Sequence, residues 1–368
     1  MEAAPRTSTG SYWLWVFAVV LGLFVASEVG LRLLTGADSK WNIRLGANKQ
    51  HDALAGFRNK PHYDLGHGLR TNEYGYRAPE GLQPPLPSDA IRIVYVGDSN
   101  SVLPQHRYYP LQVEEMLERE LGVAVETVNT AVPGYSSQNA RLLFESEVSR
   151  FDADHAVVYL GWNDLGQFGP EGLPYKKIER GYEVSTLQRV LSNIYSIRFL
   201  YAFQSYASRW KPSFYGPMSP EDTALYDAYE PRHFDENLRA IVSLALRRYP
   251  HVYVASIATI TNDQPDEYAL ATAHYPTGMD RNMKKLHQLV MKYDRVVREV
   301  AGDLGAELLD FHALFDAPEA RRTFTDSCHV NEDGAHRMAR LVSDAIARHE
   351  HEQPSLPRPG AAAAAPAH

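Results

Sequence analysis

A run of β-branched residues that ends at a glycine constrains the fold of this chain more than any other stretch. Residues 91–96 read Ile-Arg-Ile-Val-Tyr-Val, and Gly97-Asp98-Ser99 follow directly. Such a run is typical of a buried central strand in a parallel sheet, and the glycine indicates a sharp turn after it. Ser99 is therefore expected just past the carboxyl end of a strand, where open α/β sheets bind their ligands.

A serine in this position has two interpretations. It is a nucleophile if a base and an oxyanion hole arrive from elsewhere in the chain. Otherwise, Asp98 or Ser99 only caps the helix that follows. The tripeptide by itself does not distinguish the two, so the other motifs of the chain must decide.

Strand and helix patterns alternate after Ser99. The expected strands lie at 91–96, 123–128, 156–160, 252–257 and 306–310, and the expected helices at 111–121, 137–149, 282–304 and 333–348. This alternation predicts a parallel sheet with helices on both faces. We therefore expect an α/β protein whose main domain, over residues 90–350, is a three-layer α/β/α fold with a five-stranded, flavodoxin-like parallel sheet.

Residues 165–250 depart from this rhythm and are expected to form an aromatic-rich, helical insertion. Two helices are predicted, around 186–208 and 233–248, and Tyr195 and Phe199 share helical spacing in the first. Packing over one edge of the domain explains the pattern, and a lid or a surface resting on lipid or long substrate is the alternative. The long polar loop at 259–278 is a candidate wall of a binding site.

The N-terminal region predicts a membrane helix. No charged residue occurs between Arg6 and Glu28, and residues 11–34 supply roughly 20 apolar residues, about one bilayer. A short flank, 1–10, precedes the helix. A cleavable signal peptide is the alternative, but the stretch before the apolar run has only Arg6 as a positive side chain. We expect an uncleaved single-pass anchor, with Glu28 and Arg32 forming an ion pair near its end.

The charges that flank the predicted span bear on which side of the membrane the domain lies. Three positive residues (Arg32, Lys40 and Arg44) follow the span and only Arg6 precedes it, which favours a cytoplasmic domain. Long domains translocate largely regardless of such counts. We therefore expect the domain to be extracytoplasmic or periplasmic.

Composition sets further bounds. The formal net charge of -8 argues against a nucleic-acid partner, which favours a basic face. A single cysteine, Cys328, excludes an internal disulfide. We expect residues 35–89 to be a connector with short extended pieces. The Pro/Ala-rich tail at 351–368 is expected to be disordered, because it has no means of burying a core. The oligomeric state is left open.

Four separated blocks are expected to meet at one place. They are Gly97-Asp98-Ser99, Gly134 in a loop after a strand, Gly161-x-Asn163-Asp164 after another strand, and Asp326-Ser327-Cys328-His329 before the last helix. In a parallel sheet, every strand-to-helix turn lies at the same edge. The first three blocks therefore converge there, and the fourth follows the fifth strand and is able to return to that edge.

These blocks resemble, in order, the four motifs of the SGNH (GDSL-type) hydrolase family. Ser99, Gly134, Asn163 and His329 match the four letters of the family name, and the resemblance covers about residues 91–348. Two positions depart from the family pattern: Asn100 stands where leucine is common, and Ala131 where glycine is frequent. Neither departure removes a reacting group.

The resemblance implies a Ser-His-Asp mechanism. Ser99 is the expected nucleophile, His329 its base, and Asp326 the residue that orients His329. The backbone N–H groups of Ser99 and Gly134, with the amide of Asn163, form the expected oxyanion hole. Four supporting residues complete the predicted site: Gly97, Asp98, Gly161 and Asp164.

Structural alternatives stand beside these roles. If the site is not catalytic, Asn163 is expected only to hold a turn, and Asp326 or Asn331 only to cap the last helix. Cys328 is expected to be structural and to point away from Asp326 and His329. The histidines are scattered, so no metal site is expected, and neither is a cofactor.

The expected function is hydrolysis of ester bonds, most plausibly the removal of acetyl or other short acyl groups from a carbohydrate or cell-envelope substrate. The substrate part rests on family analogy. The expected partners are an acylated small molecule, glycan or lipid, together with the membrane. Two alternatives remain: an O-acyltransferase that uses the same acyl-enzyme with a glycan acceptor, and a non-catalytic envelope-binding module.

Overall fold

The computed structural model describes residues 9–35, 48–82, 90–166, 194–197, 199–200, 211–276 and 279–355. The chain divides into two compact units. One comprises residues 1–49 and 183–211, and the other comprises residues 50–182 and 212–368. The predicted helix at 186–208, the flank 1–10 and the tail 351–368 fall largely outside the described residues.

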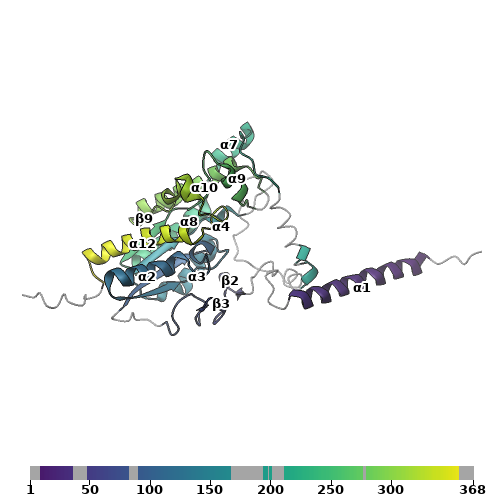
Figure 1. The fold of residues 1–368 in the computed structure, drawn as a ribbon, viewed down its shortest axis with the longest axis horizontal. Coiled ribbons are helices and arrows are strands. Elements are labelled where there is room, and N and C mark those ends of the chain that lie inside the picture. Colours follow the sequence, from purple (N-terminus) through teal and green to yellow (C-terminus); the bar gives the residue numbers. More distant parts are fainter. Residues whose placement is uncertain are drawn as a thin grey trace, which may run out of the picture. The chain divides into compact units, whose positions relative to one another are not determined.

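The larger unit is built on a five-stranded parallel sheet, as predicted (Figure 1). The strand order is β6(Ala124–Asn129), β5(Ala90–Gly97), β7(His155–Tyr159), β8(His251–Ala255) and β9(Glu307–Leu309). Every residue of β5 is buried. Arg92 is accommodated within it because its guanidinium pairs with Glu126 of β6 at 2.8 Å.

Two groups of helices flank this sheet. α2(Tyr109–Leu121) packs against α12(Glu332–Glu352), while α8(Arg232–Arg248) packs against both α3(Ser137–Ser146) and α10(Met283–Leu304). The three-layer α/β/α prediction is therefore confirmed. The shorter helices are α4(Trp162–Leu165), α7(Pro220–Ala228), α9(Glu267–Thr272) and α11(Pro318–Arg321), with 3-10 turns at η1(Ser99–Ser101), η2(Val148–Arg150) and η3(Ala313–Phe315).

Some predicted boundaries differ from the structure. The helix expected over 137–149 ends at Ser146 and continues as the 3-10 turn η2. The loop at 259–278 contains α9, whose first turn is capped by the Asp266 carboxylate accepting a hydrogen bond from Ala269 N at 2.8 Å. A single aspartate ahead of a short apolar stretch is a weak sequence signal, so the sequence did not reveal this helix.

The region expected to be a connector packs onto the domain. It contains β1(Lys49–Asp52), β2(Gly56–Asn59), β3(Asp64–Gly66) and β4(Leu69–Arg70). Asn59 Nδ2 donates to Ala131 O at 3.2 Å, and Asn139 Nδ2 donates to Ala55 O at 2.9 Å. Arg77 exchanges two backbone hydrogen bonds with Asn129 at the end of β6, both 3.1 Å long. This segment therefore supports the loop that follows β6.

The smaller unit contains α1(Thr9–Thr35). Its stretch Ser11–Leu33 is long and apolar enough to cross a membrane, with a mean hydropathy of 2.2, and none of the stretch is buried. A signal sequence near an N-terminus has the same character. The predicted ion pair between Glu28 and Arg32 is present at 3.0 Å.

Candidate active site

Ser99 follows β5 after one residue, Asp98, and opens the 3-10 turn η1. Asp98 caps this turn, because its Oδ1 accepts a hydrogen bond from Asn100 N at 2.9 Å. A Cβ on Gly97 would lie 2.5 Å from Ser101 Oγ and 3.1 Å from Tyr159 O. Only glycine therefore fits between the turn and the neighbouring strand β7.

A hydrogen-bonded chain links Ser99 to the loop before α12. His329 Nε2 lies 2.8 Å from Ser99 Oγ, and His329 Nδ1 lies 2.6 Å from Asp326 Oδ2. The other carboxylate oxygen of Asp326 accepts hydrogen bonds from Cys328 N at 3.0 Å and from His329 N at 2.9 Å. One carboxylate thus holds both the imidazole and the backbone that carries it.

The electrostatics of this chain suit acid–base chemistry. Burial by itself raises the pKa of Asp326, but the hydrogen bond and charge of His329, with the two backbone N–H groups, lower it to about 2. Burial likewise opposes the charged form of His329, but Asp326 outweighs this and raises the pKa of the imidazole. The pairing with Asp326 therefore stabilises the protonated form of the His329 imidazole, as a base that accepts a proton from a serine requires.

The third block follows β7 at the same edge of the sheet. Asn163 lies on α4, and its Nδ2 donates to Asp98 Oδ2 at 2.9 Å. Gly161 adopts a φ of +134°, and a Cβ there would lie 2.8 Å from Ile257 Cδ1, so glycine is required. Burial raises the pKa of the Asp98 carboxyl to about 6, against the lowering effect of its hydrogen bond with Asn100 N.

Gly134 lies in the loop after β6, with a φ of +88°. Val132 N donates to Gly97 O at 3.3 Å, which ties this loop to the end of β5 two residues before Ser99. The Tyr135 hydroxyl donates to Phe57 O in a short hydrogen bond. The loop that carries Gly134 is thus held from one side by the strand of Ser99 and from the other by β2.

Asp164 connects the third block to α3. Its two carboxylate oxygens accept hydrogen bonds from Ser137 N at 2.8 Å and from Ser137 Oγ at 2.6 Å. Its carbonyl oxygen accepts a hydrogen bond from the Tyr293 hydroxyl at 2.9 Å. Asp164 thus joins three elements and fixes the position of α4.

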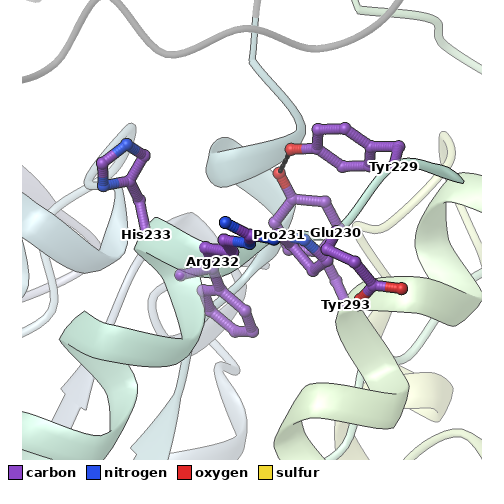
Figure 2. A pocket seen from close by; sticks show the side chains of 7 residues that line it. Tyr229, Glu230, Pro231, Arg232, His233 and Tyr293 are labelled. Atoms are coloured by element: carbon purple, nitrogen blue, oxygen red, sulfur yellow. Dashed lines mark hydrogen bonds between the residues drawn. The ribbon is translucent and has the colours of Figure 1, made fainter.

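Tyr293 also lines a pocket of about 200 Å³ (Figure 2). The Tyr229 and Tyr293 hydroxyls are hydrogen-bonded to each other at 3.0 Å in its wall. It is lined by Tyr229, Glu230, Pro231, Arg232, His233, Phe234 and Tyr293. Phe234 also lies 3.3 Å from the Cβ position of Gly161, so the pocket wall continues into the loop that carries Asn163.

The thiol of Cys328 does not point away from the site as expected. Its Sγ lies 3.8 Å from His329 Nδ1, and the side chain is buried. Burial raises the pKa of this thiol well above its usual value, so it stays protonated. Asp326, Cys328 and His329 bring oxygen, sulfur and nitrogen atoms within 4.8 Å of one another. This is a possible donor set for a soft cation, but its imidazole nitrogen and carboxylate already bond to each other.

The sequence did not predict two residues, Asn129 and Arg77, whose side chains bind the backbone of the turn near Ser99. Asn129 Nδ2 donates to Ser101 O at 2.7 Å, and Arg77 Nη1 donates to Val102 O at 3.0 Å. Together they hold the backbone of the turn that contains Ser99. An asparagine at the end of a predicted strand was the available signal for Asn129, whereas Arg77 lies in a segment with no periodic pattern.

The structure has a three-layer α/β/α fold in which Ser99 lies just past the carboxyl end of the central parallel strand β5. A model of the GDSL-like lipase/acylhydrolase family matches residues 95–337, so the chain belongs to this family. The family supports assignment as a serine esterase, and the expected resemblance is confirmed. A search of curated proteins finds no match.

Solved structures with a similar fold include two acetylxylan esterases. Axe2 from Geobacillus stearothermophilus is 15% identical, with a TM-score of 0.42 over 70% of this chain and 94% of its own. The acetyl xylan esterase AlAXEase is 14% identical, with a TM-score of 0.42 over 70% of this chain and 100% of its own.

Proposed function

We propose that this protein is a membrane-anchored esterase that removes acetyl or other short acyl groups from a carbohydrate or cell-envelope substrate, with Ser99 as its nucleophile. The observation that carries the proposal is the continuous chain from Ser99 Oγ through His329 to Asp326, with links of 2.8 and 2.6 Å. The family supplies the class of reaction.

The geometry supports two half-reactions. Ser99 Oγ attacks the ester carbonyl while His329 Nε2 accepts its proton, and the same nitrogen returns that proton to the departing alcohol. Water then attacks the acyl-enzyme, again giving its proton to His329, and the acid leaves as the Ser99 hydroxyl is restored. Asp326 stays ionised throughout and stabilises the imidazolium in both steps.

The proposed oxyanion hole consists of the backbone N–H groups of Ser99 and Gly134 and the side-chain amide of Asn163. An amide nitrogen carries two hydrogens. Asp98 accepts one of those on Asn163 at 2.9 Å. This bond fixes which end of the amide is the donor and leaves the second hydrogen for the substrate oxygen.

The substrate class follows from the placement we propose for the domain. With α1 as an uncleaved anchor and the domain on the extracytoplasmic side, acylated envelope polymers are the esters within reach. The pocket lined by Tyr229, Phe234 and Tyr293 offers mostly apolar surface, and Phe234 connects it to the third block at Gly161. Such a lining is suited to the apolar face of a sugar ring or to a short acyl chain.

The test uses the full chain in detergent, with Ser99→Ala and the matched control Ser149→Ala. We expect the wild type and Ser149→Ala to react with a fluorophosphonate probe and to release p-nitrophenol from p-nitrophenyl acetate. We expect Ser99→Ala to do neither. A folded wild type that does not react would contradict the esterase assignment. Acyl product that appears on an added glycan faster than free acid would identify a transferase instead.

A further inference from the structure

A segment from the aromatic insertion packs against the end of the apolar helix α1. Residues 194–197 and 199–200 lie in the same compact unit as α1, although more than 150 residues separate them in sequence. The proposed esterase chemistry uses none of these residues. Three of their hydrogen bonds are accepted by a single carboxylate, that of Glu28.

Glu28 accepts three hydrogen bonds from this segment. Its Oε1 accepts from Tyr195 N at 2.9 Å, and its Oε2 accepts from Ser196 N at 3.0 Å and from Ser196 Oγ at 3.2 Å. The Arg32 guanidinium completes the set with an ion pair at 3.0 Å. The Glu28 side chain is consequently only 15% exposed, whereas Leu33, one turn further on, is 82% exposed.

Two further contacts strengthen this junction, the contact of α1 with Tyr195 and Ser196. The hydroxyl oxygens of Ser27 and Ser196 lie 3.0 Å apart. The Arg32 guanidinium carbon lies 4.8 Å from the centre of the Tyr195 ring, which is buried. Ser27, Glu28 and Arg32 thus present one face of α1 to the segment, and each contributes a different kind of interaction.

The position of Glu28 along α1 determines how deep in the bilayer the contact between α1 and the segment lies. An α-helix rises about 1.5 Å per residue, so Glu28 lies roughly 7–8 Å before the end of the apolar stretch at Leu33. A carboxylate at that depth is costly in a bilayer unless it is paired. The three donors from the segment and the Arg32 guanidinium supply that pairing near the boundary between acyl chains and headgroups.

The segment also presents exposed apolar side chains beside this junction. Phe199 is 40% and Leu200 is 62% exposed, and they follow the contacts of Tyr195 and Ser196 with α1 by three to five residues; Val29, next to Glu28 on α1, is 50% exposed. Apolar side chains next to a membrane span are suited to the interfacial layer of a bilayer. Because Tyr195 and Ser196 attach this short segment to the proposed membrane span at Glu28, lipid is the partner that the exposed Phe199 and Leu200 would meet.

We propose that residues 194–197 and 199–200 form an interfacial membrane element, which Glu28 holds against α1, with Phe199 and Leu200 inserted at the boundary between headgroups and acyl chains. The inference rests on the proposed membrane span and is independent of the esterase chemistry. It assigns part of the aromatic insertion to the lipid surface.

The first test traps the junction in the full chain, reconstituted in vesicles of phosphatidylcholine and phosphatidylglycerol. In the double variant Ser27→Cys/Ser196→Cys, mild oxidation is expected to give an intrachain disulfide, identified by mass spectrometry of the linked peptides. Adding Glu28→Ala is expected to reduce its yield strongly, whereas the exposed control Glu319→Ala leaves it unchanged. A disulfide between two chains, or none, would overturn the proposal.

The second test measures lipid contact in the same vesicles, with a photoreactive phospholipid and peptide mapping. We expect label on α1 and on the peptide containing Phe199 and Leu200, and background levels on peptides with the exposed residues Leu54 and Leu225. Glu28→Ala is expected to remove label from the Phe199 peptide only. Label on α1 without label at Phe199 and Leu200 would overturn this inference alone. Absence of label on α1 would overturn the span as well, while probe reaction at Ser99 reports the esterase chemistry separately.

Discussion

The two halves of the proposed site, the acid–base pair and the oxyanion hole, are organised over very different distances along the chain. Asp326 and His329 are three residues apart, and one carboxylate binds both the imidazole at 2.6 Å and the backbone N–H of His329 at 2.9 Å. Asn163, by contrast, is oriented by Asp98, 65 residues away, and Gly134 lies in a loop that β2 supports.

This difference predicts how each half responds to change. A local turn that carries its own hydrogen bonds keeps its shape when distant packing loosens. The oxyanion half depends on tertiary contacts, so loss of remote support reaches it first. Substitutions in the acid–base half should therefore alter chemistry with little effect on stability, and substitutions around Gly134 should alter both.

The largest effect after loss of Ser99 is expected for Asp326→Asn. Asparagine retains an oxygen for the N–H groups of Cys328 and His329, but its amide nitrogen cannot accept the Nδ1 proton of His329. The imidazole is then held in the wrong tautomer, and kcat should fall roughly 10⁴-fold. The melting temperature should change little at a pH above the folded pKa of His329, where the charge pairing no longer stabilises the fold. The exposed residue Asp333 supplies the control Asp333→Asn, and a loss below about tenfold would exclude Asp326 from the triad.

Asn163→Ala tests the oxyanion half directly. Removing one donor to the oxyanion should lower kcat by about 10²–10³, with KM little changed, because the interaction forms only in the transition state. Steady-state kinetics measure kcat and KM, and fluorophosphonate labelling measures the reactivity of Ser99. A change confined to KM would show that Asn163 binds substrate rather than the oxyanion.

Tyr135→Phe probes the remote support of the Gly134 loop. It removes the hydroxyl that donates to Phe57 O, so the protein should lose about 1 kcal/mol of stability. Turnover should fall less than for Asn163→Ala, since no reacting group is removed. Thermal unfolding and kcat are compared with Tyr63→Phe as the control. An unchanged melting temperature and kcat would mean that residues 50–82 do not support the site.

The smallest effect is a shift in the pH profile. Since Asp326 raises the pKa of His329 above its ordinary value of 6.5, kcat/KM should rise with pH through a midpoint above 6.5 as the imidazole becomes a base. The same pairing stabilises the fold fully below pH 6.5, and this stabilisation is lost as pH rises through the folded pKa. In Asp326→Asn the residual activity should show a lower midpoint. A midpoint that is the same in Asp326→Asn as in the wild type would show that Asp326 does not raise the pKa of His329.

Local patterns explain why much of this molecule was predictable from sequence. The strand run at 91–96, the glycines after strands and the alternation of helices and strands were sufficient for the five-stranded sheet. The four blocks carry their residue types in short stretches, and sheet topology brings Ser99 and His329 together across 230 residues.

The features that the sequence did not reveal depend on backbone atoms or on side-chain direction. Asn59 and Asn139 bond to carbonyl groups 72 and 84 residues away, which no residue type marks. The thiol of Cys328 faces His329 because the turn held by Asp326 directs it there. For the same reason, the contact between Glu28 and residues 195–196 was not evident, although its partner Arg32 was.

Capture of the acyl-enzyme tests the central claim most directly. The full chain is mixed with p-nitrophenyl acetate, quenched in acid during turnover and digested, and the peptides are analysed by mass spectrometry. We predict one acetyl group on the peptide that contains Ser99, at the Ser99 side chain, and none in Ser99→Ala. Turnover with no acetyl on Ser99, or with the acetyl on another residue, would contradict the account.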